Sequence, residues 1–370
     1  MNYLRGSEWR KWDLHVHTPY SILNNQFGSD WDAYVKELFL RAIKSEIAVI
    51  GITDYFSIEG YKKLKTEYLQ DDNKLKILFN EEIANDPDFI TKIRNITVFP
   101  NVEFRFKDVI QNHGKDCKIE GHVIFSDKLS VADIESKFFS KLSFLDIESG
   151  GNTKNPLNKH NIEEFGKKIK AEQPTFANES DYLVGIKLLV VDCSDMIEVL
   201  KENFKGNFEF LIPEDDITTI KWDTQAHMIR KNYYINANGI FTTNEKTIRW
   251  GLKPETAKEF RSLKPCFSYS DCHCFDDMFK FANNKPCWVK ADPTFEGFKQ
   301  VFNQPTERVF IGDKPEKIKQ IEQKKYYYID RLMILKNIAA KNKNTWFDAD
   351  LNINSGLVAI LGIKAVAKVL

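Results

Sequence analysis

Short apolar runs rich in β-branched residues alternate along the chain with charged segments of helical period. Runs that end in a polar or charged residue and are followed by such segments are typical of strands followed by helices. The alternation predicts an α/β fold organised as a βα barrel. The expected strands cover residues 11–16, 48–53, 96–99, 122–125, 184–191, 208–212, 238–242 and 266–270.

The segments between these runs divide into helices and one irregular stretch. Residues 31–45 and 133–141 have the period of amphipathic helices. Residues 149–178, which contain GGNTKNPLNKHN, are polar and irregular. We expect this stretch to be an insertion that lies over the barrel mouth or along its side.

A domain boundary is predicted where GDKPEKIKQIEQKK brings a proline and a run of charge before a new apolar run. This pattern assigns residues 1–312 to the first domain and 313–325 to a linker. Residues 326–370 then start a second unit, in which two strands are expected at 328–338 and 356–361.

Metal-ligating side chains recur at the ends of the expected strands. In DLHVHTPYS, His15 and His17 stand two apart at the end of a strand, so their side chains leave on one face and can bind one ion. Neutral imidazole is a good ligand for Zn, Mn or Fe. A βα barrel places its active site at this end of its strands. The other strand ends offer Asp54, Glu103, His122, Asp271 and His273.

On these residues the sequence resembles the PHP (polymerase and histidinol phosphatase) superfamily over about residues 9–312. The resemblance implies a distorted (β/α)7 barrel with up to three divalent ions (Mn, Zn, Fe or Mg). It implies that Glu103 bridges a first ion, held with His15, His17 and Asp271, and a second ion, held with His122. The family's Thr-Asp-His motif is here Thr53-Asp54-Tyr55, so a histidine for a third ion is missing. We therefore expect one or two ions.

This site predicts the hydrolysis of a phosphoester. Divalent ions about 3.5–4 Å apart activate a bound water and neutralise charge on a phosphoryl group. Arg105, two residues beyond Glu103 on the same strand face, and Lys290 are the candidate catalytic cations. Either could instead form an ordinary surface ion pair. Cys272 and Cys274 flank His273, and strand alternation favours a packing role for both.

A narrower resemblance involves the end of the chain. Residues 287–312 are similar to the segment that closes the PHP domain in TrlF-like proteins, where that domain is fused to an SMC/ABC-type ATPase linked to DNA repair or defence. Residues 326–370 resemble the start of that ATPase. A Walker A loop needs G-x-x-x-x-G-K-[ST], whereas residues 362–369 (GIKAVAKV) lack the second glycine and the hydroxyl. We expect no ATPase activity from this chain, which is read as a truncated gene product or as half of a split system with a separately encoded ATPase subunit.

Composition limits the class of protein. The chain has 370 residues, with 53 basic and 53 acidic side chains, so any nucleic-acid binding must be local rather than due to a global positive field. No signal peptide and no stretch of about 18 apolar residues occurs, which predicts a cytoplasmic protein without a membrane anchor. The six cysteines form no CxxC pair and are expected to be free thiols.

Three functions remain open from the sequence. The first is a metal-dependent phosphoesterase acting on nucleic acid, DNA or RNA, or on nucleotides, in a repair or defence context. The second is a small-molecule phosphatase of histidinol-phosphate type. The third is a non-catalytic, partner-binding remnant that folds around one ion. The retained ligands His15, His17, Glu103, Asp271 and His273 favour an enzyme.

Overall fold

The computed structural model describes residues 7–108, 110–112, 115–146, 153–213, 227–324, 329, 331–334 and 349–353. Its main feature is a sheet of nine strands in the order β11-β10-β9-β6-β3-β2-β1-β12-β13. The strands are β1 (Trp9–His17), β2 (Ile47–Tyr55), β3 (Thr97–Arg105), β6 (Glu120–Phe125), β9 (Phe208–Pro213), β10 (Gly239–Phe241), β11 (Cys266–Phe267), β12 (Cys287–Lys290) and β13 (Val309–Ile311).

The sheet curls into a nearly closed, barrel-like α/β structure. The chain that leaves β11 returns to the end of β1, where Cys272 bridges to Val16 and the Asp271 N–H donates to the His15 carbonyl at 3.1 Å. The start of β1 pairs instead with β12. The expected α/β barrel is thus confirmed at this level. Two strands depart from the all-parallel arrangement. Strand β6 runs antiparallel to both β3 and β9, and β12 runs antiparallel to both β1 and β13.

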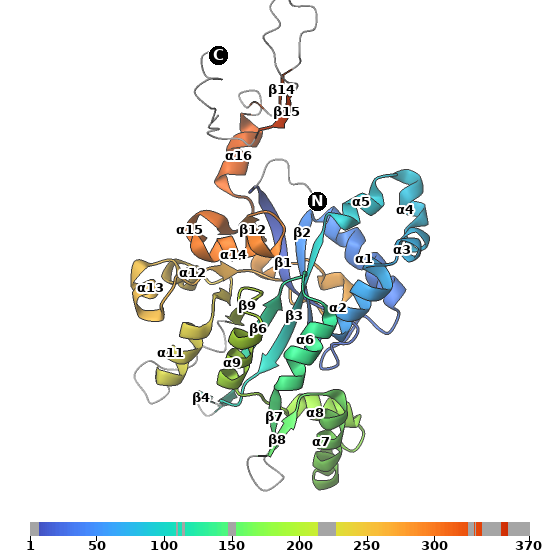
Figure 1. Ribbon diagram of the computed structural model, residues 1–370, viewed down its shortest axis with the longest axis vertical. Helices are drawn as coiled ribbons and strands as arrows, with labels where there is room; N and C mark the ends of the chain where they lie inside the picture. Colours follow the sequence, from blue (N-terminus) through green and yellow to red (C-terminus); the bar gives the residue numbers. More distant parts are fainter. Residues whose placement is uncertain are drawn as a thin grey trace, which may run out of the picture.

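Helices cover the outside of the sheet (Figure 1). The expected helix at 31–45 is confirmed as α1, which starts where the Asp30 carboxylate accepts from the Ala33 N–H. The expected helix at 133–141 is α6 followed by a 3₁₀ turn at Phe139–Lys141. The helices are α1 (Trp31–Lys44), α2 (Glu59–Lys63), α3 (Asp72–Leu78), α4 (Asn80–Asn85), α5 (Phe89–Arg94), α6 (Val131–Lys137), α7 (Lys159–Glu172), α8 (Asp181–Leu188), α9 (Cys193–Asn203), α11 (His227–Asn236), α12 (Glu245–Gly251), α13 (Pro254–Phe260), α14 (Phe295–Asn303), α15 (Pro305–Arg308) and α16 (Glu316–Gln323).

Aromatic side chains fill the end of the barrel at which β1 begins. Phe298 of α14 lies 5.7 Å from Trp12, 6.1 Å from Phe99 and 5.7 Å from Phe267, measured between ring centroids. These rings belong to three different strands, and all are buried. Burial of large aromatic side chains contributes a few kcal/mol each. The packed end is therefore a core, and the opposite end is left for a site.

Two expectations for residues 149–191 are wrong. The stretch 149–178 contains α7, which begins after the Asn158 cap and buries an apolar stripe at helical spacing, so much of it is regular. The expected strand at 184–191 is largely α8, whose first turn is capped by Ser180. Gly166 and Gly185 let α7 and α8 approach closely, because an added Cβ at either would lie about 2 Å from a backbone oxygen of the other helix or its entry. This tertiary packing overrides the β-propensity of the run.

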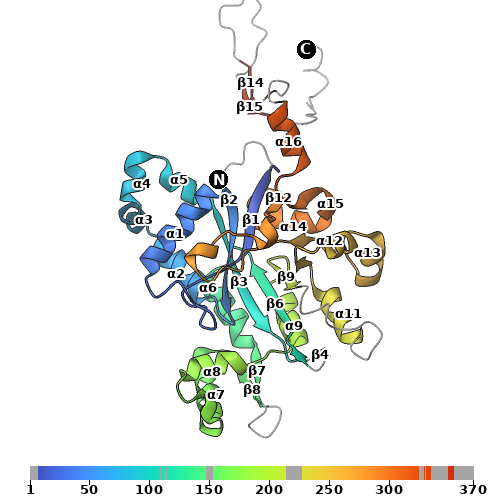
Figure 2. The ribbon, with the colours of Figure 1, turned by 180° about the vertical axis from the view of Figure 1, so that it is seen from behind.

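The α7–α8 lobe lies at the opposite end of the molecule from α16 in both Figure 1 and Figure 2. The Lys187 carbonyl of α8 accepts from Arg105, the last residue of β3. The lobe is therefore beside the barrel mouth, in agreement with the expected place of the insertion.

The expected linker at 313–325 contains a helix, α16, over residues Glu316–Gln323. Beyond it, β14 (Arg331–Ile334) falls inside the expected strand at 328–338 and pairs with β15 (Ala349–Asn352). The second expected strand at 356–361 and the loop at 362–369 lie outside the described residues. The ATPase start and the division into domains stay predictions.

None of the helices in the described ranges combines the length and the apolarity needed to cross a bilayer.

The structure records Cys193, Cys266, Cys272, Cys274 and Cys287 as free thiols, as expected.

A buried glutamate on β9 predicts a pH-dependent stability. Glu209 shares a face with Leu211, which pairs with His122, so its side chain points into the barrel. Burial raises the pKa of its carboxyl from 4.5 to about 8, and Lys299 only partly offsets this. Because its pKa is higher in the folded state, the folded state holds this proton more tightly than the unfolded state does. The resulting contribution of Glu209 to the free energy of unfolding is complete below pH 4.5 and is lost as the pH rises through about 8.

Glu209→Gln should therefore remove part of the loss of stability at alkaline pH. We expect its melting temperature at about pH 9 to exceed that of the natural chain by roughly 4 °C, with little difference at about pH 5. Thermal melts at both pH values measure this. Glu202→Gln, at an exposed position on α9, is the control. Equal pH dependence in Glu209→Gln and the natural chain would refute the explanation.

Candidate metal centre

The end of β1 presents two imidazoles to one point inside the barrel mouth. His15 and His17 are buried and lie on one face of the strand. Their Nε2 atoms are only 2.9 Å apart. Two ring nitrogens at this distance need a proton or a cation between them, because two lone pairs would repel each other.

Two carboxylates from other strands complete this cluster. Glu103 Oε2 lies 3.3 Å from the Nε2 atoms of both His15 and His17. Asp271 Oδ1 lies 3.2 Å from the first nitrogen and 3.3 Å from the second. Four tetrahedral ligands at about 2.0–2.1 Å from an ion are separated from one another by about 3.3 Å. The separations between imidazole nitrogens and carboxylate oxygens therefore have the size that such an ion requires.

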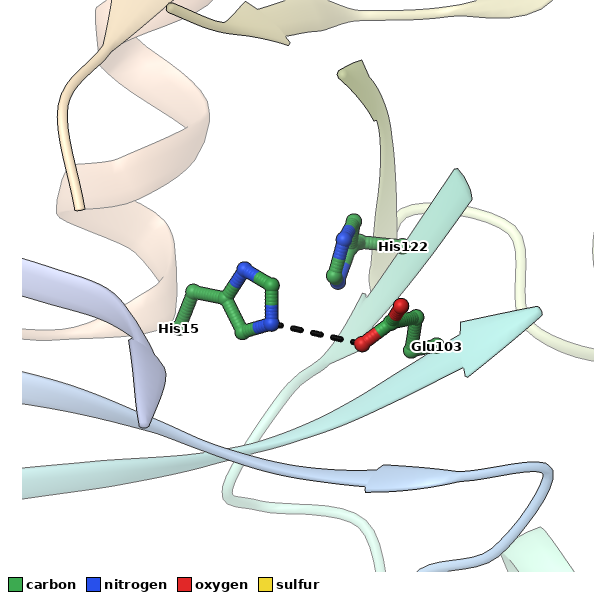
Figure 3. A group of neighbouring side chains, drawn as sticks. All are labelled: His15, Glu103 and His122. Carbon is green, nitrogen blue, oxygen red and sulfur yellow. Dashed lines mark ion pairs between the residues drawn. The ribbon is translucent and has the colours of Figure 1, made fainter. Parts of the chain in front are cut away.

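His122 extends the cluster away from His17. His15, Glu103 and His122 offer ligand atoms within 4.8 Å of one another, as do His15, His17 and Asp271. Figure 3 shows the first three side chains turned toward a common point. His122 lies near the start of β6, and the antiparallel course of that strand brings it to the mouth beside Glu103. The two overlapping groups fit one or two ions.

The imidazoles of His17 and His273 are each held by a contact at Nδ1, which fixes the direction of Nε2. Ser21 Oγ donates to Asp54 Oδ1 at 2.8 Å or to the Thr53 carbonyl at 3.1 Å, so it accepts from His17 Nδ1 at 2.8 Å. His273 Nδ1 lies 2.8 Å from the Asn24 carbonyl and must donate to it. Both imidazoles then carry their proton on Nδ1 and direct Nε2 toward Asp271 Oδ1, the arrangement of metal-bound histidines.

The carboxylate of Glu103 gives a second indication that the cluster binds a divalent ion. Glu103 Oε2 is buried and makes no hydrogen bond of good geometry within the described residues. A buried anionic oxygen without such a partner is costly unless a cation meets it. Mixed imidazole and carboxylate ligands suit Zn, Mn or Fe.

Electrostatics inside the cluster favour the ligand form of Glu103, Asp271 and His122, whereas His17 would have to lose a proton on binding an ion. Burial alone would raise the pKa of Glu103 and of Asp271, but the neighbouring imidazoles outweigh it and hold both pKa values well below the ordinary range. Burial lowers the pKa of His122 to about 3, and His15 adds to this. Burial lowers the pKa of His17, yet Asp271 and Glu103 outweigh that and raise it to about 9. The carboxylates are thus ionised and His122 is neutral at neutral pH.

Asp54 lies beside this cluster rather than in either ligand group. It pairs with Val102 on the next strand, whereas its neighbour Tyr55 pairs with the ligand Glu103, so strand alternation turns Asp54 to the other face. There its carboxylate accepts from Thr18, Ser21 and the Gly60 N–H. Burial raises its pKa to about 6 although these hydrogen bonds lower it. Asp54 thus contacts Ser21, which in turn contacts His17, and its expected part in metal binding stays a prediction.

The two candidate cations occupy opposite ends of the barrel. Arg105 ends β3 at the mouth, and its guanidinium lies 5.7 Å from the centroid of the Tyr55 ring. Lys290 pairs with Trp9 at the start of β1, six residues before His15. At about 3.3 Å per residue this is roughly 20 Å from the ligands. A catalytic role for Lys290 does not fit this position, which its antiparallel strand sets.

Aromatic rings surround the ligands, and the sequence did not identify them. Tyr269 stacks on His15 with ring centroids 5.1 Å apart, and Phe241 lies 4.9 Å from His122. Tyr55 stands where the resemblance expects a histidine, and its ring lies 4.9 Å from that of His17. Burial and the carboxylates of Glu103 and Asp271 raise the pKa of the Tyr55 phenol far above its ordinary value. Single aromatic residues at strand ends carry no sequence signal that separates them from core residues.

A cavity of about 820 Å³ adjoins the mouth. Its walls come from the loops after β1 and β2, from α6 and from the α7–α8 lobe; Tyr20, Ile58, Leu157, Ile162 and Tyr182 are among its lining residues. Tyr20 follows the ligand His17 by three residues, which limits the distance between their Cα atoms to about 11 Å. The cavity is therefore close to the metal cluster.

No protein-family model matches the sequence, and no curated protein matches it. Among solved structures, a candidate metal-dependent phosphoesterase from Bifidobacterium adolescentis is similar at 11% identity and a TM-score of 0.33, covering 72% of this chain and 89% of that one. An amidohydrolase from Chromobacterium violaceum is similar at 12% identity and a TM-score of 0.36, covering 81% of this chain and 98% of that one. Similarity at this level assigns no family, so a function has to be inferred from the site itself.

Proposed function

We propose that the protein is a metal-dependent hydrolase that cleaves phosphoester bonds. The observation that carries the proposal is the cluster of His15, His17, Glu103 and Asp271, whose ligand atoms lie 2.9–3.3 Å apart in the pairs described. A divalent ion bound there would activate water and stabilise negative charge on a phosphoryl group. His122 would take part in holding a second ion.

The protein's own residues supply the rest of the site. Ser21 and the Asn24 carbonyl orient the imidazoles of His17 and His273. Arg105 adds a cation at the mouth that can contact an anionic substrate. The packed aromatic end closes the barrel opposite the mouth, so substrate has to enter from the side of the α7–α8 lobe.

For the substrate, we propose nucleic acid or nucleotides, in a repair or defence context and with a separately encoded ATPase as partner. This part depends on the resemblance of residues 287–312 and 326–370 to TrlF-like proteins. The equal numbers of acidic and basic side chains imply that a nucleic acid would be bound locally, at the mouth.

The cavity beside the mouth favours a second candidate, a phosphatase for a small substrate. Its volume of about 820 Å³ lies within the usual range of small-molecule sites. If the organic part of the substrate enters it, Leu157→Trp should fill part of the space and raise KM for mononucleotides by about 10-fold. Ile77→Trp, at an exposed site on α3, is the matched control. An unchanged KM in Leu157→Trp would exclude the cavity as a substrate site.

The test of function is metal analysis of the purified chain combined with hydrolysis assays in added Mn²⁺. The substrates are p-nitrophenyl phosphate, a bis-p-nitrophenyl diester, mononucleotides and single-stranded DNA. Cleavage of DNA alone would support the nuclease and exclude the small-molecule phosphatase, and cleavage of monoesters alone would do the reverse. Absence of bound metal and of all hydrolysis would overturn the proposal in favour of a non-catalytic binding module.

A further inference from the structure

Tyr55 belongs to the same row of side chains as two metal-ligand candidates. It pairs with Glu103 on β3, and Glu103 pairs with His122 on β6. Paired residues on neighbouring strands point to the same face and lie about 5 Å apart. Tyr55 is also the last residue of β2. Its side chain is therefore at the mouth, next to the ligands and within reach of a substrate bound to the ion.

The backbone after Tyr55 fixes this placement. Phe56 adopts a left-handed φ of 53°, and its N–H donates to the Glu103 carbonyl at 3.0 Å. A positive φ at a bulky residue is uncommon and persists only where the surroundings hold it. The turn ends the strand immediately after Tyr55 and keeps its ring beside Glu103.

Two neighbours hold the ring of Tyr55 in a defined orientation. The imidazole of His17 lies 4.9 Å from it at an interplanar angle of 30°. The guanidinium of Arg105 lies 5.7 Å from its centroid, within the range of a cation–π contact. The ring of Tyr55 thus contacts both His17, a candidate metal ligand, and the guanidinium of Arg105.

Arg105 is itself anchored in a way that leaves one nitrogen for a ligand. Its Nε donates to Glu120 Oε1 at 3.1 Å, and its Nη1 donates to the Lys187 carbonyl at 3.3 Å. Within the described residues, neither its Nη2 nor the Tyr55 hydroxyl makes a hydrogen bond. Two donors with unused capacity therefore lie close together at the mouth, and both side chains are only partly exposed.

We propose that the Tyr55 hydroxyl and Arg105 Nη2 together bind the non-bridging oxygens of the phosphoryl group while that group faces the metal ligands. This rests on the proposed function and adds a catalytic residue to it. A hydrogen bond from a fixed phenol and one from a guanidinium stabilise the charge on such oxygens. The alternative role for Tyr55, simple packing against His17, needs the ring but not the hydroxyl.

Tyr55→Phe separates the two roles, because it keeps the ring and removes only the hydroxyl. The experiment titrates inorganic phosphate into the Mn²⁺-loaded full chain and measures heat. We expect the phosphate Kd of Tyr55→Phe to rise about 10-fold, with unchanged metal content and melting temperature. Arg105→Met should weaken phosphate binding by at least as much. Tyr61→Phe, at a buried phenol on α2 whose hydroxyl accepts from Lys65, is the control.

Each outcome decides the proposal. An unchanged phosphate Kd in Tyr55→Phe, or no phosphate binding by the Mn²⁺-loaded natural chain, would overturn it. If phosphate binds and Tyr55→Phe weakens it, the anion site stands even where no phosphoester is hydrolysed, and only the proposed function then fails. If hydrolysis occurs, kcat of Tyr55→Phe should fall about 10-fold as well, since the contact serves the reacting group.

Discussion

Replacing His15 with alanine is expected to remove bound metal and to lower kcat/KM for phosphoester hydrolysis by roughly 10³-fold or more. The reason is its place in the site. His15 belongs to both candidate ligand groups, and its Nε2 lies within 3.3 Å of His17, Glu103 and Asp271. Behind its ring lie the aromatic rings of Tyr269 and Phe241, with centroids 5.1 Å and 5.8 Å away, rather than another imidazole or carboxylate. Metal analysis and hydrolysis assays on the same sample measure both effects.

A folding defect has to be separated from loss of the ligand, since His15 is 5% exposed and its removal leaves a cavity. His15→Asn keeps most of the volume and should lose metal and activity to a similar degree. His160→Ala, on the exposed side of α7, should change neither. Activity near that of the natural chain in a folded His15→Ala would exclude the proposed centre.

Much of the candidate site could be predicted from the sequence because strand ends bring distant residues together. The spacing of His15 and His17 alone predicts that their side chains lie on one face of a strand. Glu103 and Asp271 follow apolar runs that predict buried strands. The structure brings these four ligand atoms to 2.9–3.3 Å from one another in the pairs described. This part needed only the alternation of side chains and the tendency of strand ends to meet at one edge.

The remaining assignments depended on facts that the sequence does not contain. Asp54 and Tyr55 are adjacent, and only the register with β3 decides which of them faces the metal cluster. Lys290 follows an apolar run like the others, but its strand runs antiparallel to β1 and carries it to the far end. His122 reaches the mouth from near the start of its strand because β6 is reversed.

The predicted secondary structure was wrong where contacts between helices outweigh the local propensity of the residues. Residues 184–191 are rich in β-branched and apolar side chains, yet Gly185 and Gly166 allow α8 to pack closely on α7, and helix is the result. The polar stretch before it contains α7 because three buried side chains, Ile162, Phe165 and Ile169, recur at helical spacing among exposed ones. A helix with so narrow an apolar stripe gives a weak signal until its partner is known.

The contacts behind His17 lead to the second large effect, which concerns affinity for the metal. Ser21 Oγ accepts from His17 Nδ1 and lies 2.8 Å from Asp54 Oδ1, so one hydroxyl joins the imidazole to a buried carboxylate. Ser21→Ala should leave the Nδ1–H of His17 without this acceptor and free the ring to turn. Loss of such a partner of a metal-bound histidine typically costs about 10–100-fold in metal affinity. Titration with Mn²⁺, followed by calorimetry, measures this constant directly.

The expected pattern distinguishes orientation of the ligand from removal of the ligand. At saturating Mn²⁺, Ser21→Ala should recover most of its hydrolytic activity, because His17 itself remains, whereas His15→Ala should recover little. Asp54→Asn should show a smaller loss of affinity, since Ser21 can still accept from His17 while its own contact to the carboxylate weakens. Ser136→Ala, an exposed serine on α6, controls for the loss of a hydroxyl. Natural Mn²⁺ affinity in Ser21→Ala would mean that His17 is oriented by packing against Tyr55 and His273 and not by this hydrogen bond.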